Sequence, residues 1–237
     1  MNLILLFPKD FINTKTAQLS DHRHNHILKI LKAKQDDELC IGLINSDIGT
    51  GKIINIDKNS TILHVKLSYP PPKKSLVTLI LALPRPLVLK RTLLNISSMG
   101  VKKLILLNFN RVEKSFWNSS ILKPNELKKN LILGLEQCKD TVMPEVIIKK
   151  RFKPFVEDEL PHITKNHTKL IAHPEATTPC PKNINKKSTL IIGPEGGILP
   201  FELDLLARQG FTQIHFCKRI LKVETIVPAI LGRLSAI

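Results

Sequence analysis

Residues 190–197 read LIIGPEGG, so an apolar run passes into a turn with three glycines, one proline and the carboxylate of Glu195. Glycine lets the backbone approach a ligand closely, and open α/β sheets bind ligands beyond the carboxyl ends of their strands. We therefore expect this loop to border a small-molecule site, the alternative being a simple tight turn between a strand and a helix. The loop matches neither the GxGxxG dinucleotide fingerprint nor a P-loop, because no P-loop lysine follows its glycines.

Two other segments, 171–175 and 216–225, also follow short apolar runs and are rich in polar residues. If these runs are parallel strands of one sheet, their ends converge on the glycine loop. A lone His173 or Glu224 is more often structural than catalytic, and that alternative stays open here. Thr225 is a suitable N-cap for a final helix, with Pro228 in its first turn.

The first 72 residues show short strand-like runs separated by turn residues, at 3–7, 38–45, 50–57 and 61–69. This pattern predicts a small β-barrel. One helix interrupts it, with Asp21 as its cap and Ile27, Leu28 and Leu31 on a single face.

Three consecutive prolines at 70–72 form a stiff extended connector, and the pattern changes after them. Strands and helices now alternate, which predicts a mostly parallel α/β sheet. Pro86 and Pro200 suit the first turn of a helix, whereas Gly100 and Gly210 suit left-handed caps at helix ends. The expected strands are 76–83, 103–109, 169–172, 189–192 and 213–217, and the expected helices are 86–99, 124–139, 200–209 and 225–236.

The chain carries 36 Lys and Arg against 20 Asp and Glu among 237 residues, a net charge of +16 that favours a polyanionic partner such as nucleic acid. No apolar run approaches the roughly 18 residues that span a bilayer, so we expect a cytoplasmic protein without a membrane anchor. The spacing of the four cysteines matches no zinc motif. His22, His24 and His26 alternate and do not share one helix face, so no metal is expected.

Four sequence features together resemble the RsmE family of 16S ribosomal RNA uracil-N3 methyltransferases. They are GPEGG at 193–197, the following FEL helix that ends at Gly210-Phe211, RILKVET at 219–225, and HILKILK at 26–32. The resemblance covers almost the whole chain. The combination of the glycine loop with the RIL segment is highly specific.

The resemblance implies an α/β fold of the SPOUT type, with a C-terminal trefoil knot at 73–237, preceded by a PUA-like β-barrel that binds RNA at 1–72. It implies methylation of uracil N3 with S-adenosylmethionine as cofactor, 16S ribosomal RNA within the small ribosomal subunit as partner, and a homodimer. Because N3 lies on the Watson–Crick edge, the target uridine must be unpaired or flipped out.

The resemblance also implies the roles of individual residues. The expected catalytic residues are Arg219, for charge stabilisation and orientation, with Glu195 and Glu224 as candidate carboxylates. The expected cofactor-binding residues are Ile171, His173, Ile192, Gly193, Gly197, Phe216, Lys218, Ile220, Leu221 and Thr225. The expected RNA-binding residues are Arg23, Lys29 and Lys32.

The chain departs from the family pattern at two helices. Residues 95–100 read NISSMG where the family has KAxELG, and Glu136-Gln137 is kept without the arginine that usually follows it. Two alternatives therefore remain open. One is a SPOUT methyltransferase with a different RNA target, a ribose 2′-oxygen or another base, and the other is a non-catalytic RNA-binding factor for ribosome assembly.

Overall fold

The computed structural model describes residues 2–235. The chain forms two compact units. The first contains the described part of 1–73 together with Ile132–Met143, and the second contains Lys74–Leu131 together with the described part of 144–237. Among the described residues, no helix is both long enough and apolar enough to cross a membrane.

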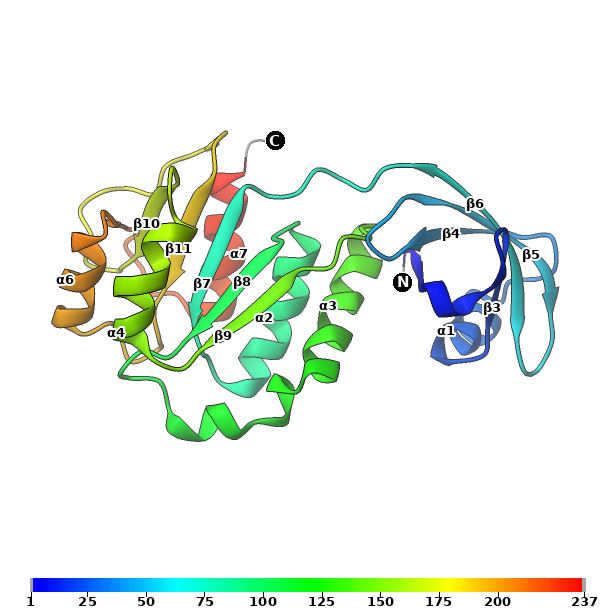
Figure 1. The fold of residues 1–237 in the computed structure, drawn as a ribbon, viewed down its shortest axis with the longest axis horizontal. Coiled ribbons are helices and arrows are strands. Elements are labelled where there is room, and N and C mark those ends of the chain that lie inside the picture. The colour runs from blue at the N-terminus through cyan, green and yellow to red at the C-terminus, as the bar shows by residue number, and fades with distance from the viewer. Residues whose placement is uncertain (1, 236–237) are drawn as a thin grey trace. The chain divides into compact units, whose positions relative to one another are not determined.

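The first unit is built on a six-stranded sheet in the order β1-β4-β5-β6-β3-β2, shown in blue to cyan in Figure 1. The pairs are antiparallel except β1 with β4, which is parallel. The four expected strands are confirmed, and two short ones between them were missed. The strands are β1 (Ile4–Leu6), β2 (Phe11–Asn13), β3 (Thr16–Leu19), β4 (Glu38–Leu43), β5 (Ile48–Ile56) and β6 (Thr61–Tyr69).

The expected helix begins as α1 (His22–Asn25) and continues as a π-helical stretch, His26–Leu31. The Asp21 side chain accepts the backbone N–H of Arg23 at 2.9 Å, which confirms the predicted cap. The predicted apolar face is only partly correct, because Ile27 is buried in the core while Leu31 is exposed. The wider π turn moves residue i+4 off the line that an α-helix would keep.

The second half of α3 (Pro124–Cys138) packs in the first unit, although it follows the proline connector by about 60 residues. Leu135 joins a buried cluster with Leu3, Leu5 and Ile48. The backbone N–H groups of Asn2 and Leu3 donate to the Glu136 carbonyl oxygen at 3.1 and 3.0 Å. Each such buried aliphatic side chain contributes about 1.5–3 kcal/mol to folding.

The second unit is a six-stranded, all-parallel sheet in the order β12-β10-β11-β7-β8-β9, which confirms the predicted parallel α/β architecture. The strands in its centre are apolar because both of their faces are covered. The strand β9 was missed. The strands are β7 (Val77–Ala82), β8 (Lys103–Leu107), β9 (Glu145–Lys149), β10 (Thr168–Ala172), β11 (Ser188–Ile192) and β12 (Thr212–Ile214).

Figure 1 shows α2 (Pro86–Ser98) and α7 (Val223–Leu234) on one face of this sheet, and α4 (Phe152–Pro154) and α6 (Pro200–Arg208) on the other. Pro86 and Pro200 occupy first-turn positions of α2 and α6, as predicted. Gly100 and Gly210 follow the two helices with φ of +75° and +82°, as a left-handed cap requires. The helical segment that α4 begins continues to α5 (Leu160–Ile163) and was not anticipated.

The last helix corrects one prediction. It begins at Val223 with Lys222 as its N-cap, so Thr225 lies inside the first turn and Pro228 lies in the helix interior. The Thr225 backbone N–H already donates to the Lys222 carbonyl oxygen at 2.9 Å, so the helix has begun before Thr225 is reached. The predicted last residue of this helix, Ala236, lies outside the described residues.

Candidate functional site

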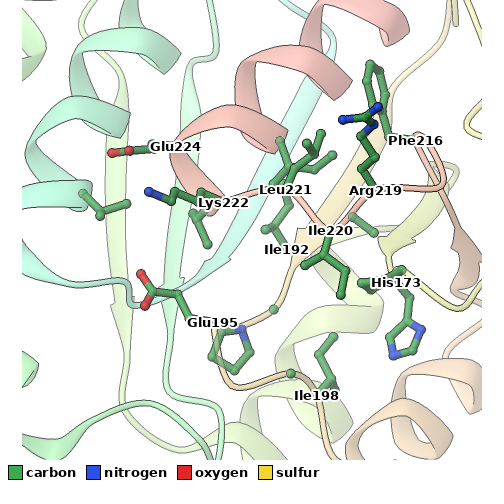
Figure 2. A pocket seen from close by; sticks show the side chains of 18 of the residues that line it. His173, Ile192, Glu195, Ile198, Phe216, Arg219, Ile220, Leu221, Lys222 and Glu224 are labelled. Carbon is green, nitrogen blue, oxygen red and sulfur yellow. The ribbon is translucent and has the colours of Figure 1, made fainter.

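A cavity of about 660 Å³ lies beyond the carboxyl ends of β10, β11 and β12, beside the start of α2. The three loops singled out from the sequence all contribute to its wall. Of the predicted residues, those that line it are Glu195, Arg219, Glu224, His173, Ile192, Gly193, Gly197, Phe216, Ile220 and Leu221, most of which are labelled in Figure 2.

Part of the wall is apolar, with Ile192, Ile198, Phe216 and Leu221 among its lining residues. Such a surface suits the flat ring of an adenine. A Cβ at Gly193 would clash with the Ile198 side chain, so glycine is needed for this close packing beside the cavity. The cavity therefore fits a nucleoside-containing cofactor bound by apolar contact and by loop backbone.

The Phe216 ring, which lines the cavity, lies against the guanidinium of Arg233 in α7. The Arg233 guanidinium carbon lies 5.9 Å from the centroid of the Phe216 ring. Its Nε also donates to the Cys180 carbonyl oxygen at 2.8 Å, which ties the loop between β10 and β11 to the same helix. These two contacts of Arg233 help to orient the Phe216 side chain in the absence of a ligand.

The glycine loop is braced internally and from a distant segment. The Gly197 N–H donates to the Pro194 carbonyl oxygen at 2.9 Å, and Gly197 has φ of +81°, a region that favours glycine. Arg111 Nη1 donates to the Gly196 carbonyl oxygen at 2.6 Å. Sequence reasoning missed Arg111, because it precedes its partner by 85 residues and carries no motif.

A fully buried carboxylate fixes the helix that follows the glycine loop. Glu202 accepts the N–H of Leu199 at 2.9 Å, which closes a capping interaction at the start of α6. Its other oxygen accepts the N–H of Asn110 at 2.8 Å. Glu202 thus joins the segment after β8 to α6, and both flank the loop.

Both predicted carboxylates are paired with arginines that sequence reasoning did not single out. Arg85 Nε lies 3.1 Å from Glu195 Oε2, and Arg91 Nη1 lies 3.1 Å from Glu224 Oε2. Both arginines line the cavity at the start of α2. The sequence could have indicated these arginines only by their position, because the start of α2 directly follows the carboxyl end of β7, where ligands of such sheets bind.

Arg219 occupies a different part of the site from the two carboxylates. Figure 2 shows its side chain beside that of Phe216 on the right, whereas Glu195 and Glu224 both lie on the left of the view. Arg219 is exposed, as is its neighbour Ile220 at 86%. A guanidinium there is open to an approaching substrate.

Three predicted cofactor residues do not line the cavity. Ile171 is fully buried because it lies one residue before the strand end, and Ala172 reaches the cavity instead. Lys218 is exposed to solvent outside the wall. Thr225 is exposed on α7 because that helix starts earlier than predicted.

The predicted RNA-binding residue Arg23 is buried in the first unit. Arg23 is only 3% exposed, with its Nη1 at 2.6 Å from Asp10 Oδ2 and its Nη2 at 2.8 Å from Asp21 Oδ2. These hydrogen bonds to carboxylates raise the pKa of Arg23 despite its burial. Its donors are used inside the first unit, whereas the predicted Lys29 and Lys32 are exposed.

The histidines near the start of α1 have separate environments. His24 is buried with its Nδ1 2.8 Å from Thr61 Oγ1, whereas His22 is exposed. Residues 2–235 contain no group of three or more His, Cys, Asp or Glu residues positioned to hold a metal ion.

Comparison with known proteins places this site in a family. Residues 71–235 match the model of an RNA methyltransferase domain. Ribosomal RNA small subunit methyltransferase E 1 of Borreliella burgdorferi is 32% identical over 234 residues, covering 95% of this chain and 93% of that protein. The small subunit methyltransferase E of Treponema pallidum is 27% identical, covering 94% and 86%.

Solved structures show the same fold. The small subunit methyltransferase E of Neisseria gonorrhoeae, bound to S-adenosylmethionine, superposes with a TM-score of 0.75 at 19% identity and covers 98% of this chain and 95% of its own. A methyltransferase from Legionella pneumophila, also with S-adenosylmethionine, gives 0.73 at 21% identity with coverage of 98% and 96%. At these identities the likeness concerns the α/β fold.

Proposed function

The chain belongs to the ribosomal RNA small subunit methyltransferase E family of S-adenosylmethionine-dependent enzymes, and on this premise we propose that it methylates N3 of one uridine in 16S ribosomal RNA. One observation carries the proposal. The glycine loop and the segments 171–175 and 216–225, recognised separately in the sequence, line a single cavity. The matched relatives are named for the RNA of the small subunit.

The apolar wall and the glycine loop hold the methyl donor. Ile192, Ile198 and Leu221 line the cavity and would hold the adenine, and the glycine loop would hold the rest of the donor through its backbone. When bound, S-adenosylmethionine supplies an electrophilic methyl group on a sulfonium. The protein must then present the accepting nitrogen in line with the carbon–sulfur bond, which is a matter of positioning.

Uracil N3 must lose its proton before or as it attacks the methyl carbon. Of the two carboxylates, we assign this role to Glu195, because it is the more exposed and belongs to the glycine loop itself. Glu224 keeps the start of α7 against α2 through Arg91. Arg219 orients the RNA through a phosphate or a base edge from its exposed position on the opposite side of the site.

The finer architecture forms part of the same proposal. We assign residues 1–72 to a PUA-like barrel that binds RNA through Lys29 and Lys32, and 73–237 to a SPOUT domain whose loops are knotted around the cofactor. We also propose a cytoplasmic homodimer acting on the small ribosomal subunit. The net charge of +16 supports an RNA partner.

Methyl transfer to isolated small subunits tests the proposal. Subunits from a strain that lacks this gene are incubated with purified protein and S-adenosylmethionine carrying a deuterated methyl group, and the RNA is digested for mass spectrometry. The proposal expects one deuterated N3-methyluridine per subunit and none with large subunits as the control substrate. A labelled ribose or another labelled base would replace the proposed target, and RNA binding without label would favour an assembly factor.

A further inference from the structure

A second, smaller cavity of about 180 Å³ lies against the same glycine loop. It shares Arg85, Pro194 and Glu195 with the larger cavity. The ion pair between Arg85 and Glu195 therefore borders both spaces. A ligand in the smaller cavity would lie next to whatever the larger one holds.

The walls of this cavity are suited to a flat ring. Phe116 is a half-buried aromatic side chain, and Leu83, Pro84 and Val112 add apolar surface. Unpaired bases of RNA are commonly recognised by stacking on an aromatic side chain. A single pyrimidine ring is the RNA component that matches a small space with an aromatic wall next to a methyl donor.

The segment that carries Phe116 is anchored in the second unit. Phe116 lies in a 3-10 turn, Lys114–Asn118, and the neighbouring Trp117 donates from Nε1 to Asn108 Oδ1 at 2.9 Å. Arg111 lines the same cavity and holds the Gly196 carbonyl oxygen at 2.6 Å. The Arg111 hydrogen bond thus ties the chain five residues before Phe116 to the glycine loop.

The Arg85–Glu195 pair offers an acceptor next to donors. Arg85 Nε lies 3.1 Å from Glu195 Oε2, and the two side chains are 68% and 42% exposed. Besides these two atoms, the pair carries a second carboxylate oxygen that can accept a hydrogen bond and Nη groups that can donate one. Uracil presents the complementary pattern, an N3–H donor between two carbonyl acceptors. Cytosine presents the reverse at the same positions, an acceptor at N3 beside an amino donor.

We propose that the smaller cavity receives the target uracil, with its ring on Phe116 and its Watson–Crick edge against Arg85 and Glu195. This inference rests on the proposed function and adds the residues that select the base. N3 donates its proton to the Glu195 carboxylate while a ring carbonyl oxygen accepts from Arg85. N3 then bonds the methyl carbon with the electron pair of the broken N–H bond. The carbon–sulfur bond breaks, and sulfur keeps its electron pair and leaves as a neutral thioether.

Substitutions of Phe116 separate this role from cofactor binding. Phe116→Ala removes the stacking surface, Phe116→Tyr keeps it, and Phe201→Ala removes an exposed aromatic side chain of α6 outside both cavities as the matched control. For each protein, calorimetry gives the Kd for S-adenosylmethionine. The transfer rate at limiting concentrations of small subunits that lack the modification gives kcat/KM for RNA.

We expect Phe116→Ala to lower kcat/KM for the subunits by about 5- to 150-fold. The cofactor Kd should change by less than about twofold. Phe116→Tyr should recover most of the lost kcat/KM because it keeps the aromatic ring, and Phe201→Ala should match the wild type. Full activity of Phe116→Ala would overturn the proposal. An equal loss of cofactor affinity in this variant would also overturn it, because Phe116 would then act only through the shape of the glycine loop. A wild type without methyl transfer would instead remove the proposed function and this inference with it.

Base selection gives a second test through binding. Small subunits carrying cytidine in place of the methylated uridine compete with unmodified subunits for the wild-type protein. We expect cytidine to weaken competition about tenfold or more, and Glu195→Gln to reduce the preference below about threefold, since an amide can present either a donor or an acceptor. Equal competition by the two kinds of subunit would contradict the assignment of the Arg85–Glu195 pair.

Discussion

Replacing Glu136 by glutamine should make the protein more stable at neutral and alkaline pH. Glu136 is only 2% exposed, and its Oε1 accepts the Leu5 N–H at a long 3.4 Å. Its Oε2 has no hydrogen-bond partner among residues 2–235. Burial therefore disfavours the charged form and raises the pKa of Glu136 from 4.5 to about 7, with the Leu5 hydrogen bond opposing the shift only in part.

The size and sign of the effect follow from that shift. A folded pKa above the unfolded one means that the folded state holds the proton more tightly. The contribution of Glu136 to the free energy of unfolding is therefore fully present below pH 4.5 and is lost as the pH rises through about 7. At 1.36 kcal/mol for each pKa unit, the loss is about 3 kcal/mol. Glutamine has nearly the same shape and no charge to desolvate, so Glu136→Gln should gain about this amount at pH 8 and nothing at pH 4.5.

Urea unfolding followed by circular dichroism at pH 4.5, 6, 7 and 8 measures this difference. Glu126→Gln, an exposed glutamate in the first turn of the same helix, is the control and should follow the wild type at every pH. The reasoning is refuted if Glu136→Gln loses as much stability between pH 4.5 and 8 as the wild type does.

Three further predictions concern other parts of the chain. Arg23→Met should destabilise the protein by about 3–5 kcal/mol in urea unfolding, because it leaves the buried Asp10 carboxylate without its partner; unchanged stability would contradict the buried pair. Gly197→Ala should weaken S-adenosylmethionine binding about 5- to 30-fold in calorimetry, since a Cβ at φ of +81° costs about 1–2 kcal/mol, and an unchanged Kd would refute this. Substituting both Lys29 and Lys32 by glutamine should reduce the slope of log affinity for small subunits against log salt by about 2, whereas an unaltered slope would place the RNA elsewhere.

The parallel sheet and the position of its ligand site could be predicted from the sequence because both follow from local patterns. Short apolar runs alternate with helices that carry proline at their start and glycine after their end, and this alternation specifies parallel strands. The convergence of 171–175, 193–197 and 216–225 then follows, because parallel strands end at one edge of their sheet.

The partners of the site residues could not be predicted, because they come from distant segments without a motif. Arg85 with Glu195 and Arg111 with Gly196 are brought together only by the order of the strands. The burial of Arg23 in the first unit could not be predicted for the same reason. A lone arginine near the start of a helix is usually exposed, and its burial here depends on Asp10, which lies before two intervening strands.

The most direct test of the central claim uses the ribosomal RNA of the host itself. The gene is deleted, the small-subunit RNA is digested, and modified uridines are identified by mass spectrometry before and after the wild-type gene is restored. The account predicts that one N3-methyluridine disappears on deletion and returns with the gene, and that it does not return with a Gly197→Ala and Glu195→Gln double variant. An unchanged set of N3-methyluridines in the deletion strain would contradict it.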